Sequence, residues 1–222
     1  MSGALQAVFQ NQRSFGPPPP TVIGQAFEGG FYAGMISTAG DSVGDYYLVV
    51  APKSSGEGTA KQFKTLFFTD DPGATSEIDG PGNSASINNS DHPAAQFCEG
   101  LTIGGFTDWY LPAKNELEVC YYNLKTTTTD NVTNSGINAN AVPARASNYT
   151  VGTPAQTSAS AFVTGGAQEF ITGSNQFYWT STQSSNEARA WVNFFDTGNQ
   201  DPPTGKEKGN SFNVRAVRRV PV

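Results

Sequence analysis

Two segments with helical periodicity are the most regular part of this 222-residue chain, and they limit the folds it can adopt. In the first, Ala94, Phe97, Cys98 and Leu101 follow the spacing i, i+3, i+4 and i+7, which puts them on one face of a helix. Residues 113–124 repeat this spacing. The pattern predicts two short amphipathic helices, over residues 90–101 and 113–124, each with a cysteine on its buried face.

Segments with the character of β-strands lie on both sides of the two helices. They are rich in aromatic and β-branched residues, and they cover residues 31–35, 45–50, 62–68, 177–182, 188–195 and 212–220. The turn-like residues 40–44 between the first two predict a β-hairpin. Helices and antiparallel strands in different parts of the chain predict an α+β fold.

Long polar segments separate these elements. Residues 70–90, 126–166 and 196–211 are rich in Gly, Pro, Ser, Thr and Asn, so we expect them to form loops. A loop as long as 126–166 inside a compact domain is expected either to carry function or to cover the core. The fold should therefore contain many loops around a small sheet.

The charge balance limits the partners. Only 14% of the residues are charged, against about 25% in a typical soluble domain, and the formal net charge is −6. Proteins that bind nucleic acid neutralise its phosphates with Lys and Arg side chains. This chain has only 13 Lys and Arg residues against 19 Asp and Glu residues. The basic cluster of Arg215, Arg218 and Arg219 is too small to change this balance. We expect no nucleic-acid partner.

The N-terminal segment predicts an assembly arm. Residues 1–15 lack the positive leader and apolar region of a signal peptide, and no apolar run approaches the roughly 20 residues that span a bilayer. We therefore expect synthesis in a reducing cytosol, no membrane insertion, and core thiols at Cys98 and Cys120. Pro17–Pro20 form a stiff spacer. Residues 1–20 are interpreted as an arm that docks on a neighbour, with a flexible leader as the alternative, and residues 21–222 as the domain.

The residues that commonly perform catalysis are scarce. His92 is the only histidine and lies at the start of a predicted helix, where a structural role is usual. No Cys-x-x-Cys or His-x-x-x-His pair predicts a zinc site. Calcium could bind acidic loops, and the candidates are Asp70 with Asp71 and Asp196 with Asp201, although neither pair matches an EF-hand. We expect no enzyme activity, no metal and no cofactor.

Four segments resemble a group of C-type-lectin-like domains found in phage tail proteins and bacterial surface proteins. Residues 105–117 read GFTDWYLPAKNEL, and later segments read YWTST at 178–182, AWVNF at 190–194 and VRAVR at 214–218. Their order and spacing match the group over residues 90–220. The resemblance implies two helices flanking a small twisted antiparallel sheet, with residues 21–89 as preceding strands and loops and 90–222 as the core region. The motifs of calcium-dependent sugar-binding lectins are absent.

The resemblance also implies roles for individual residues. Some pack the core or fix strand ends, and these scaffold residues are Trp109, Leu111, Trp179, Trp191 and Arg215. The C-terminal region is similar to the variable regions of phage tropism determinants, in which polar positions between fixed aromatics contact a receptor. The corresponding receptor-binding candidates are Ser184, Ser185, Asn186, Glu187, Arg189, Asn193, Asp196, Asn199, Gln200, Asn210 and Asn213. Composition alone is equally typical of ordinary loops between strands.

These expectations lead to one main hypothesis and two rivals. The main hypothesis is a bacteriophage virion protein, a fibre-tip adhesin that is assembled in the host cytoplasm, forms an oligomer (first guess a trimer) and binds a glycan or protein receptor on the host. The first rival is a purely architectural capsid-decoration or tail-connector subunit. The second is an oxidase of the same fold, which would need a reactive cysteine pair in the C-terminal half, where nothing after Cys120 is a thiol.

Overall fold

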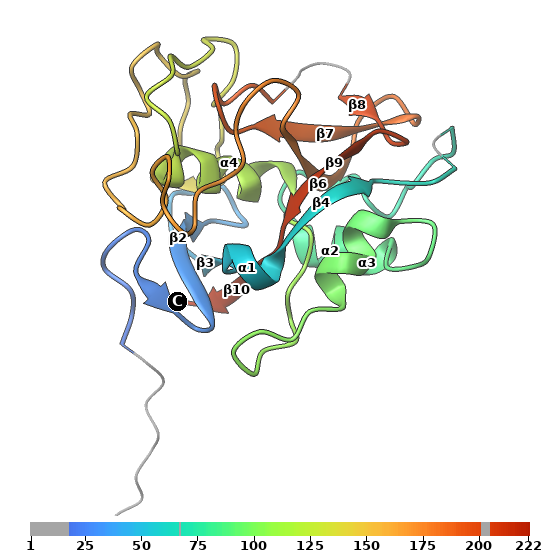
Figure 1. Cartoon of the computed structure of the whole chain (residues 1–222), viewed down its shortest axis with the longest axis horizontal. Coiled ribbons are helices and arrows are strands. Elements are labelled where there is room, and N and C mark those ends of the chain that lie inside the picture. The colour runs from blue at the N-terminus through green and yellow to red at the C-terminus, as the bar shows by residue number, and fades with distance from the viewer. Residues whose placement is uncertain (1–17, 67, 201–204) are drawn as a thin grey trace, which may run out of the picture.

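The computed structural model describes residues 18–66, 68–200 and 205–222, and its fold is α+β (Figure 1). Within these ranges the chain forms four helices and ten strands, and the strands make two five-stranded sheets. The α+β class is confirmed. The expected arrangement of two helices around one small sheet is wrong, because a second sheet and two further helices are present. Most of the predicted arm, residues 1–17, lies outside the described ranges.

The first sheet contains the predicted hairpin. Its strand order is β1-β2-β3-β10, with β5 also paired to β2, and all of these pairs are antiparallel. The strands are β1 (Ala26–Phe27), β2 (Gly30–Ile36), β3 (Tyr46–Val50), β5 (Ala141–Val142) and β10 (Val217–Pro221). Strands β2 and β3 confirm the hairpin expected from residues 31–35 and 45–50.

The second sheet carries most of the C-terminal aromatic residues. Its strand order is β4-β9-β6-β7-β8, and only β6 and β9 run parallel among the described pairs. The strands are β4 (Glu57–Gln62), β6 (Phe177–Gln183), β7 (Arg189–Phe194), β8 (Lys206–Glu207) and β9 (Ser211–Arg215). The expected strands at 177–182 and 188–195 are thus confirmed.

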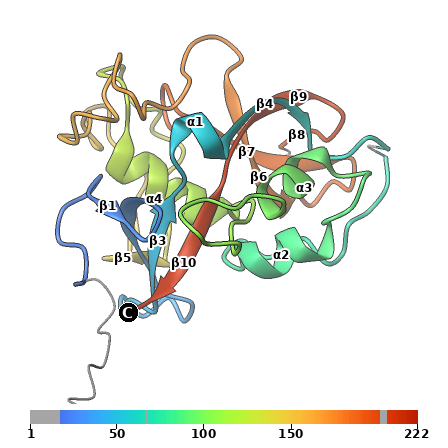
Figure 2. The same cartoon turned by 60° about the horizontal axis from the view of Figure 1, so that its bottom comes forward.

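The predicted strand over residues 212–220 divides between the two sheets. Strand β9 ends at Arg215 and β10 begins at Val217, and Figure 2 shows the two as one continuous band that joins the sheets. The buried Arg215 side chain fixes the junction: its Nε donates to the Ala51 carbonyl oxygen at 2.7 Å, and its Nη1 donates to Glu57 at 2.9 Å. The predicted single strand is therefore two strands, because β9 pairs with β4 in the second sheet and β10 pairs with β3 in the first.

Two of the helices were predicted and two were not. The helices are α1 (Lys53–Gly56), α2 (Gly80–Ser86), α3 (Pro93–Glu99) and α4 (Lys114–Leu124). Helices α3 and α4 confirm the two predicted helical segments, but α4 is buried on nearly every side rather than on one face. Helix α2 lies where a loop was expected, since its sequence GPGNSAS has low helix propensity. It is held by Asp79, which caps the Gly82 N–H, and by the buried Asn83. No helix among the described residues has the length and apolar character to cross a membrane.

The strand expected at residues 62–68 is misplaced. Strand β4 covers Glu57–Gln62 and ends where that prediction began. Beyond it, Phe63 turns into the core with none of its side chain exposed, and Lys64 turns inward to an ion pair with Asp71. The chain therefore leaves the sheet because these two side chains have buried partners elsewhere.

The core has two parts, and most of the proposed scaffold residues lie in it. Trp109, Leu111 and Trp179 belong to the apolar cluster on the α3 side of the second sheet, and Arg215 is buried at the junction of the sheets. A second cluster surrounds α4 and packs residues of the long loop. Trp191 is only half-buried, and its ring lies 4.2 Å from the Lys114 ammonium.

The long loop between α4 and β6 is an ordered cover fixed to α4 by buried polar groups. Its only strand among the described residues is β5. Glu118 of α4 is fully buried and accepts hydrogen bonds from Asn138 and Tyr149, both at 2.6 Å, and from Arg145. The Glu118 side chain thus binds three separate residues of the loop and holds them against α4.

Lys125, directly after α4, acts as an internal cation for the loop. Its ammonium donates to the Thr129 carbonyl oxygen at 2.5 Å, to Asn131 Oδ1 at 2.8 Å and to the Pro154 carbonyl oxygen at 3.3 Å. Tyr121 also donates to Asn131 Oδ1, at 2.5 Å. Burial lowers the pKa of Lys125, but three oxygen acceptors surround the charge.

We expect Lys125→Met to loosen this loop while the sheets stay intact. The change leaves buried carbonyl oxygens without their donor, which costs about 1–3 kcal/mol for each group. Hydrogen exchange should accelerate over residues 126–157 and remain unchanged in β3 and β6. The matched control, Lys53→Met, removes an ion pair with Glu169 whose side chains are 29% and 31% exposed, and it should change stability by less than about 1 kcal/mol. Equal effects of the two changes would contradict the proposed role.

Candidate functional site

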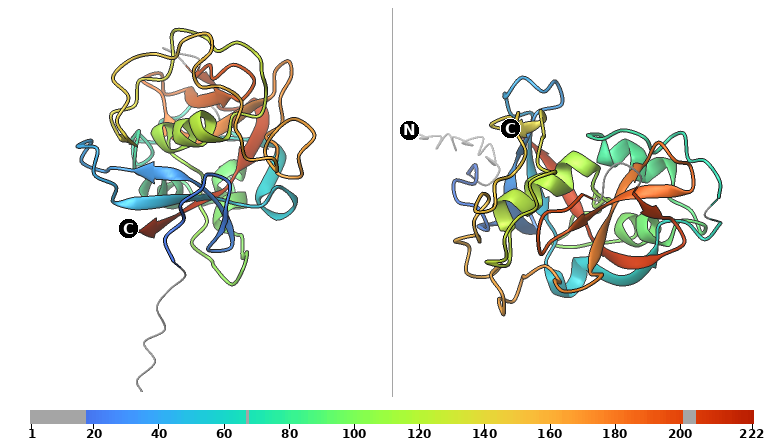
Figure 3. Two further views of the ribbon diagram at one scale, coloured as in Figure 1. Left: turned by 90° about the vertical axis from the view of Figure 1, so that its left-hand side faces the viewer. Right: turned by 90° about the horizontal axis from the view of Figure 1, so that it is seen from above.

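Three turns come together at one end of the molecule, and we call this end the distal surface. It consists of residues 64–66 and 68–71 after β4, residues 183–189 between β6 and β7, and residues 206–211 around β8. Pairing of Arg189 with Glu207, and the bond from the Lys208 N–H to the Ala188 carbonyl oxygen at 3.0 Å, join two of the turns. In Figure 1 this end lies at the right, far from the start of the described chain at the lower left, and the right-hand panel of Figure 3 shows the same separation.

A buried carboxylate, Asp71, holds the distal surface together. Its oxygens accept from Lys208 Nζ at 2.5 Å, from His92 Nε2 at 3.0 Å and from Lys64. Its backbone N–H donates to Gln183 Oε1 at 2.6 Å. Because Lys64, Gln183 and Lys208 each belong to a different turn, one side chain and its backbone connect all three.

The remaining contacts of this cluster complete the connection. Lys208 Nζ also donates to Gln183 Oε1 and, at 2.9 Å, to the Thr69 carbonyl oxygen. Gln183 Nε2 donates to Asp70. Both ring nitrogens of His92 face oxygen acceptors, since Nδ1 lies 2.9 Å from Asn89 Oδ1. The cluster is therefore a closed network, in which the cations are matched by carboxylate and carbonyl oxygens.

The pKa of Asp71 reflects this environment. Burial alone would raise the pKa of a carboxyl group, but hydrogen bonds from His92, Lys208 and Lys64 outweigh that effect and hold the pKa well below its usual range. Burial lowers the pKa of Lys208, while Asp71 opposes this shift. Asp71 is thus charged in the folded protein at neutral pH and serves as the anion of the cluster.

The receptor-binding candidates separate into three groups. Ser185, Asn186, Glu187 and Asn210 are exposed and Arg189 is half-buried, all on the distal surface. Their turn is ordered, because the Ser184 hydroxyl donates to the Asn186 carbonyl oxygen at 3.0 Å and Asn186 Oδ1 accepts from the Ala188 N–H at 3.0 Å. These five candidates do lie close together.

Two further candidates lie at the opposite end of β7. Asp196 and Asn199 are half-buried, and the Asp196 carboxylate accepts from the Thr129 hydroxyl of the long loop at 2.9 Å. The β7 strand of six residues separates them from the distal surface by about 20 Å at 3.4 Å per residue. They belong to the support of the long loop rather than to the distal surface.

The last four candidates are buried, so their assignment as receptor contacts is corrected. The interior residues are Ser184, Asn193, Gln200 and Asn213, each with at most 5% of its surface exposed. Asn193 and Asn213 both lie opposite Tyr178, in the middle of the second sheet. Other parts of the protein cover both faces of this sheet. Side chains that alternate between the two faces are therefore buried on both, and a polar residue in these strands is not an exposed one.

The distal surface also contains residues that the sequence prediction missed. Leu66 and Phe68 are 64% and 70% exposed, although their segment was interpreted as a strand. The buried charges of Lys64, Asp71 and Lys208 were not recognised either. One signal in the sequence could have indicated this loop. A short apolar run lies between Lys64 and the acidic pair Asp70-Asp71, and charged residues on both sides of such a run are also compatible with an exposed loop whose ends are held by an ion pair.

The described residues offer little for metal or thiol chemistry. Asp71 already holds two ammonium groups, which argues against it as a calcium ligand, and Asp201 of the second candidate pair lies outside the described ranges. No group of three or more His, Cys, Asp or Glu in the described part of the chain could hold a metal ion. Cys98 and Cys120 are free and buried, and burial raises the pKa of both thiols. Neither has the exposed, electropositive setting of a reactive cysteine.

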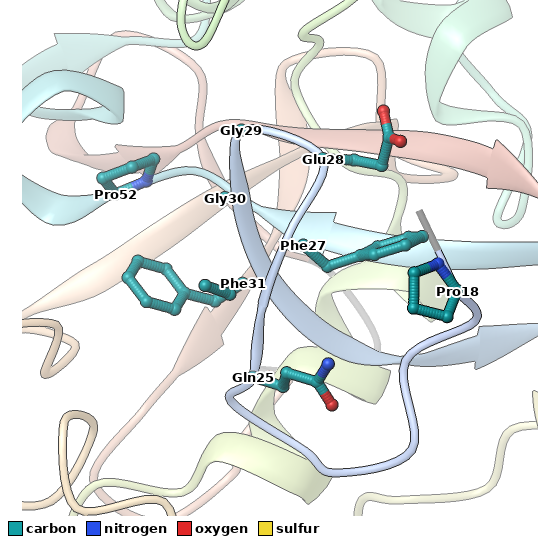
Figure 4. Close-up of a pocket in the computed structure, with 9 residues that line it drawn as sticks. Pro18, Gln25, Phe27, Glu28, Gly29, Gly30, Phe31 and Pro52 are labelled. Carbon is teal, nitrogen blue, oxygen red and sulfur yellow. The ribbon is translucent and has the colours of Figure 1, made fainter. Parts of the chain in front are cut away.

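A separate hollow lies at the other end of the molecule, beside the start of the described chain. It measures about 530 Å³ and is lined by the β1–β2 hairpin together with Pro18 and Pro52 (Figure 4). The hairpin turn at Glu28 and Gly29 has positive φ angles of 48° and 82°, which allows a tight two-residue connection. None of the receptor-binding candidates lines this hollow.

Comparison with known families identifies the class of the chain. The matching family is one of C-type-lectin-like domains found in phage tropism-determinant-like proteins. Residues 75–218 match the Lcl C-terminal domain, and the chain belongs to this family. The resemblance drawn from the sequence motifs is thereby confirmed, and the match begins before the two predicted helices. No curated protein matches the chain significantly.

We expect Asp71→Asn to destabilise the protein by about 3–5 kcal/mol, because it leaves buried ammonium groups without their counter-charge. Chemical denaturation measures the effect. The control is Glu77→Gln, which removes a partly exposed ion pair with Lys114 and should cost less than about 1 kcal/mol. A loss at Asp71 no larger than at Glu77 would show that the cluster does not stabilise the fold.

The contribution of Asp71 should depend on pH. Its folded-state pKa is depressed, so its stabilisation is fully present above the unfolded-state value of about 3.9 and is lost as the pH falls toward the folded-state value. The difference in unfolding free energy between the wild type and Asp71→Asn should therefore shrink below about pH 4. Denaturation curves at pH 6 and pH 3 test this, and a constant difference would contradict it.

Proposed function

We propose that the protein is a non-enzymatic bacteriophage virion adhesin that binds a receptor on the host cell through its distal surface. Membership of the Lcl C-terminal domain family supports the coarser assignment to phage or bacterial surface adhesin-like proteins. The observation that carries the finer proposal is the distal surface itself. Exposed polar residues of two turns lie there beside an exposed apolar tip, on a base fixed by the Asp71 cluster.

The geometry supports recognition more than catalysis. A fixed backbone presents side chains at low entropic cost, which favours binding. In the proposal, residues 1–20 attach the protein to other virion proteins, and several copies in a homo-oligomer, a trimer as the first guess, add their individually weak contacts. The protein would then be located in the virion after assembly in the host cytoplasm.

We expect the triple variant Ser185→Ala, Glu187→Ala, Asn210→Ala to bind host cells at least about tenfold more weakly, a loss of about 1.4 kcal/mol. Asn186 is retained, because its side chain stabilises the turn. The matched control changes Ser147, Asn148 and Asp130 of the long loop to alanine, and it should bind like the wild type. Binding of labelled full-length protein to host cells measures the effect.

A different result would favour the architectural role. In that case the wild-type protein shows no binding to host cells, and it is found between capsid or tail subunits in a map of the particle. Wild-type binding that the triple variant retains would instead place the receptor contacts outside these two turns.

A further inference from the structure

The apolar tip of the distal surface is formed by Leu66 and Phe68. They are among the most exposed large apolar side chains of the described residues, and they lie two positions apart in one loop. Single exposed apolar residues are common on protein surfaces. What distinguishes this pair is its place beside the polar turns, at the end remote from the start of the described chain.

The tip is held in place from both sides. The Thr65 N–H donates to the Asp91 carbonyl oxygen at 2.8 Å, and the Thr69 hydroxyl donates to the Leu66 carbonyl oxygen at 3.0 Å. The Lys208 ammonium binds the Thr69 carbonyl oxygen at 2.9 Å. The described residues on both sides of the tip thus have fixed positions, which lowers the ordering cost of binding there.

The charges around the tip are unequal. Asp70, Asp91, Glu187 and Glu207 are exposed, whereas Lys64 and Lys208 are buried in the Asp71 cluster. Among the described residues of this surface, Lys206 and Arg189 also have partners in their own chain: the Lys206 ammonium lies 4.6 Å from the Phe177 ring, and Arg189 donates to the Gly205 carbonyl oxygen at 3.3 Å. The described residues at this end thus expose four carboxylates, which we call the acidic rim, while the cations have partners within the chain.

We propose that the receptor is a protein whose surface has an apolar depression bordered by Lys or Arg, and that Leu66 and Phe68 are the anchors that fill it. This inference rests on the proposed function and adds the class of partner. Apolar anchors within a polar ring are the usual centre of a protein–protein contact, and the acidic rim complements basic residues. The same rim repels an anionic lipid surface. The hydroxyl groups of a glycan would lose water against Leu66 without gaining hydrogen bonds.

The test compares Leu66→Ser, Phe68→Ser with the wild type in binding to host cells. We expect the double variant to bind at least about 30-fold more weakly, as for a central anchor. The matched control is Ile137→Ser, Val151→Ser, which changes two residues of the long loop that are 57% and 52% exposed and should bind normally. Unchanged thermal unfolding shows that both variants are folded, which is expected because the substituted side chains are exposed.

Three further measurements identify the partner. Treatment of host cells with protease should abolish wild-type binding, periodate oxidation of their glycans should leave it intact, and vesicles of host lipids should not bind. Higher salt should slow association, because the rim and its partner carry opposite charges.

The outcomes separate the two proposals. If the wild-type protein binds no host cells, the proposed function fails. If the wild type binds but the Leu66 and Phe68 variant binds equally well, or periodate or lipid vesicles account for binding, the protein-receptor inference fails and the adhesin role stands.

Discussion

Buried charge must be paired, and this requirement organises the whole protein, because an isolated ion in the interior costs several kcal/mol. The chain has few charged residues and places many of them inside. Arg215 fixes the junction between the sheets, Glu118 and Lys125 fix the long loop, and Asp71 with Lys208 fixes the distal turns. Each network joins segments that are far apart in sequence. The loops are therefore ordered by specific polar contacts rather than by strands and helices of their own.

This organisation explains how a loop-rich protein can present a defined surface. The polar turns and the apolar tip have little regular structure, yet their bases meet at Asp71, so they hold a constant position relative to one another. Exposed side chains can then differ without changing the backbone beneath them. On such a surface the backbone keeps its position while the exposed side chains can be substituted, and this property suits recognition of a varying partner.

The part of the fold that local pattern determines could be predicted, and the part that distant contacts determine could not. Helices α3 and α4 follow from periodicity, with Ala94 and Cys98 on one buried face. Asn83 of helix α2 donates to the Ser181 hydroxyl, 98 positions away, and the pairing of Asp71 with Lys208 spans 137 positions. For the site, Ser185 and Asn186 lie in an exposed turn, as their position between two strands predicts. Asn193, also a receptor-binding candidate, is buried instead, because both faces of its sheet are covered and polarity there does not report exposure.

The division of the last strand at Ala216 has a consequence for folding. Strand β4 pairs with β9 and strand β3 with β10, so each sheet includes a partner from the final twelve residues of the chain. During synthesis, strands β3 and β4 lack these partners until residues 211–222 have left the ribosome. A chain lacking residues 211–222 would leave β3, β4 and β6 each without a neighbouring strand, and such open edges favour aggregation.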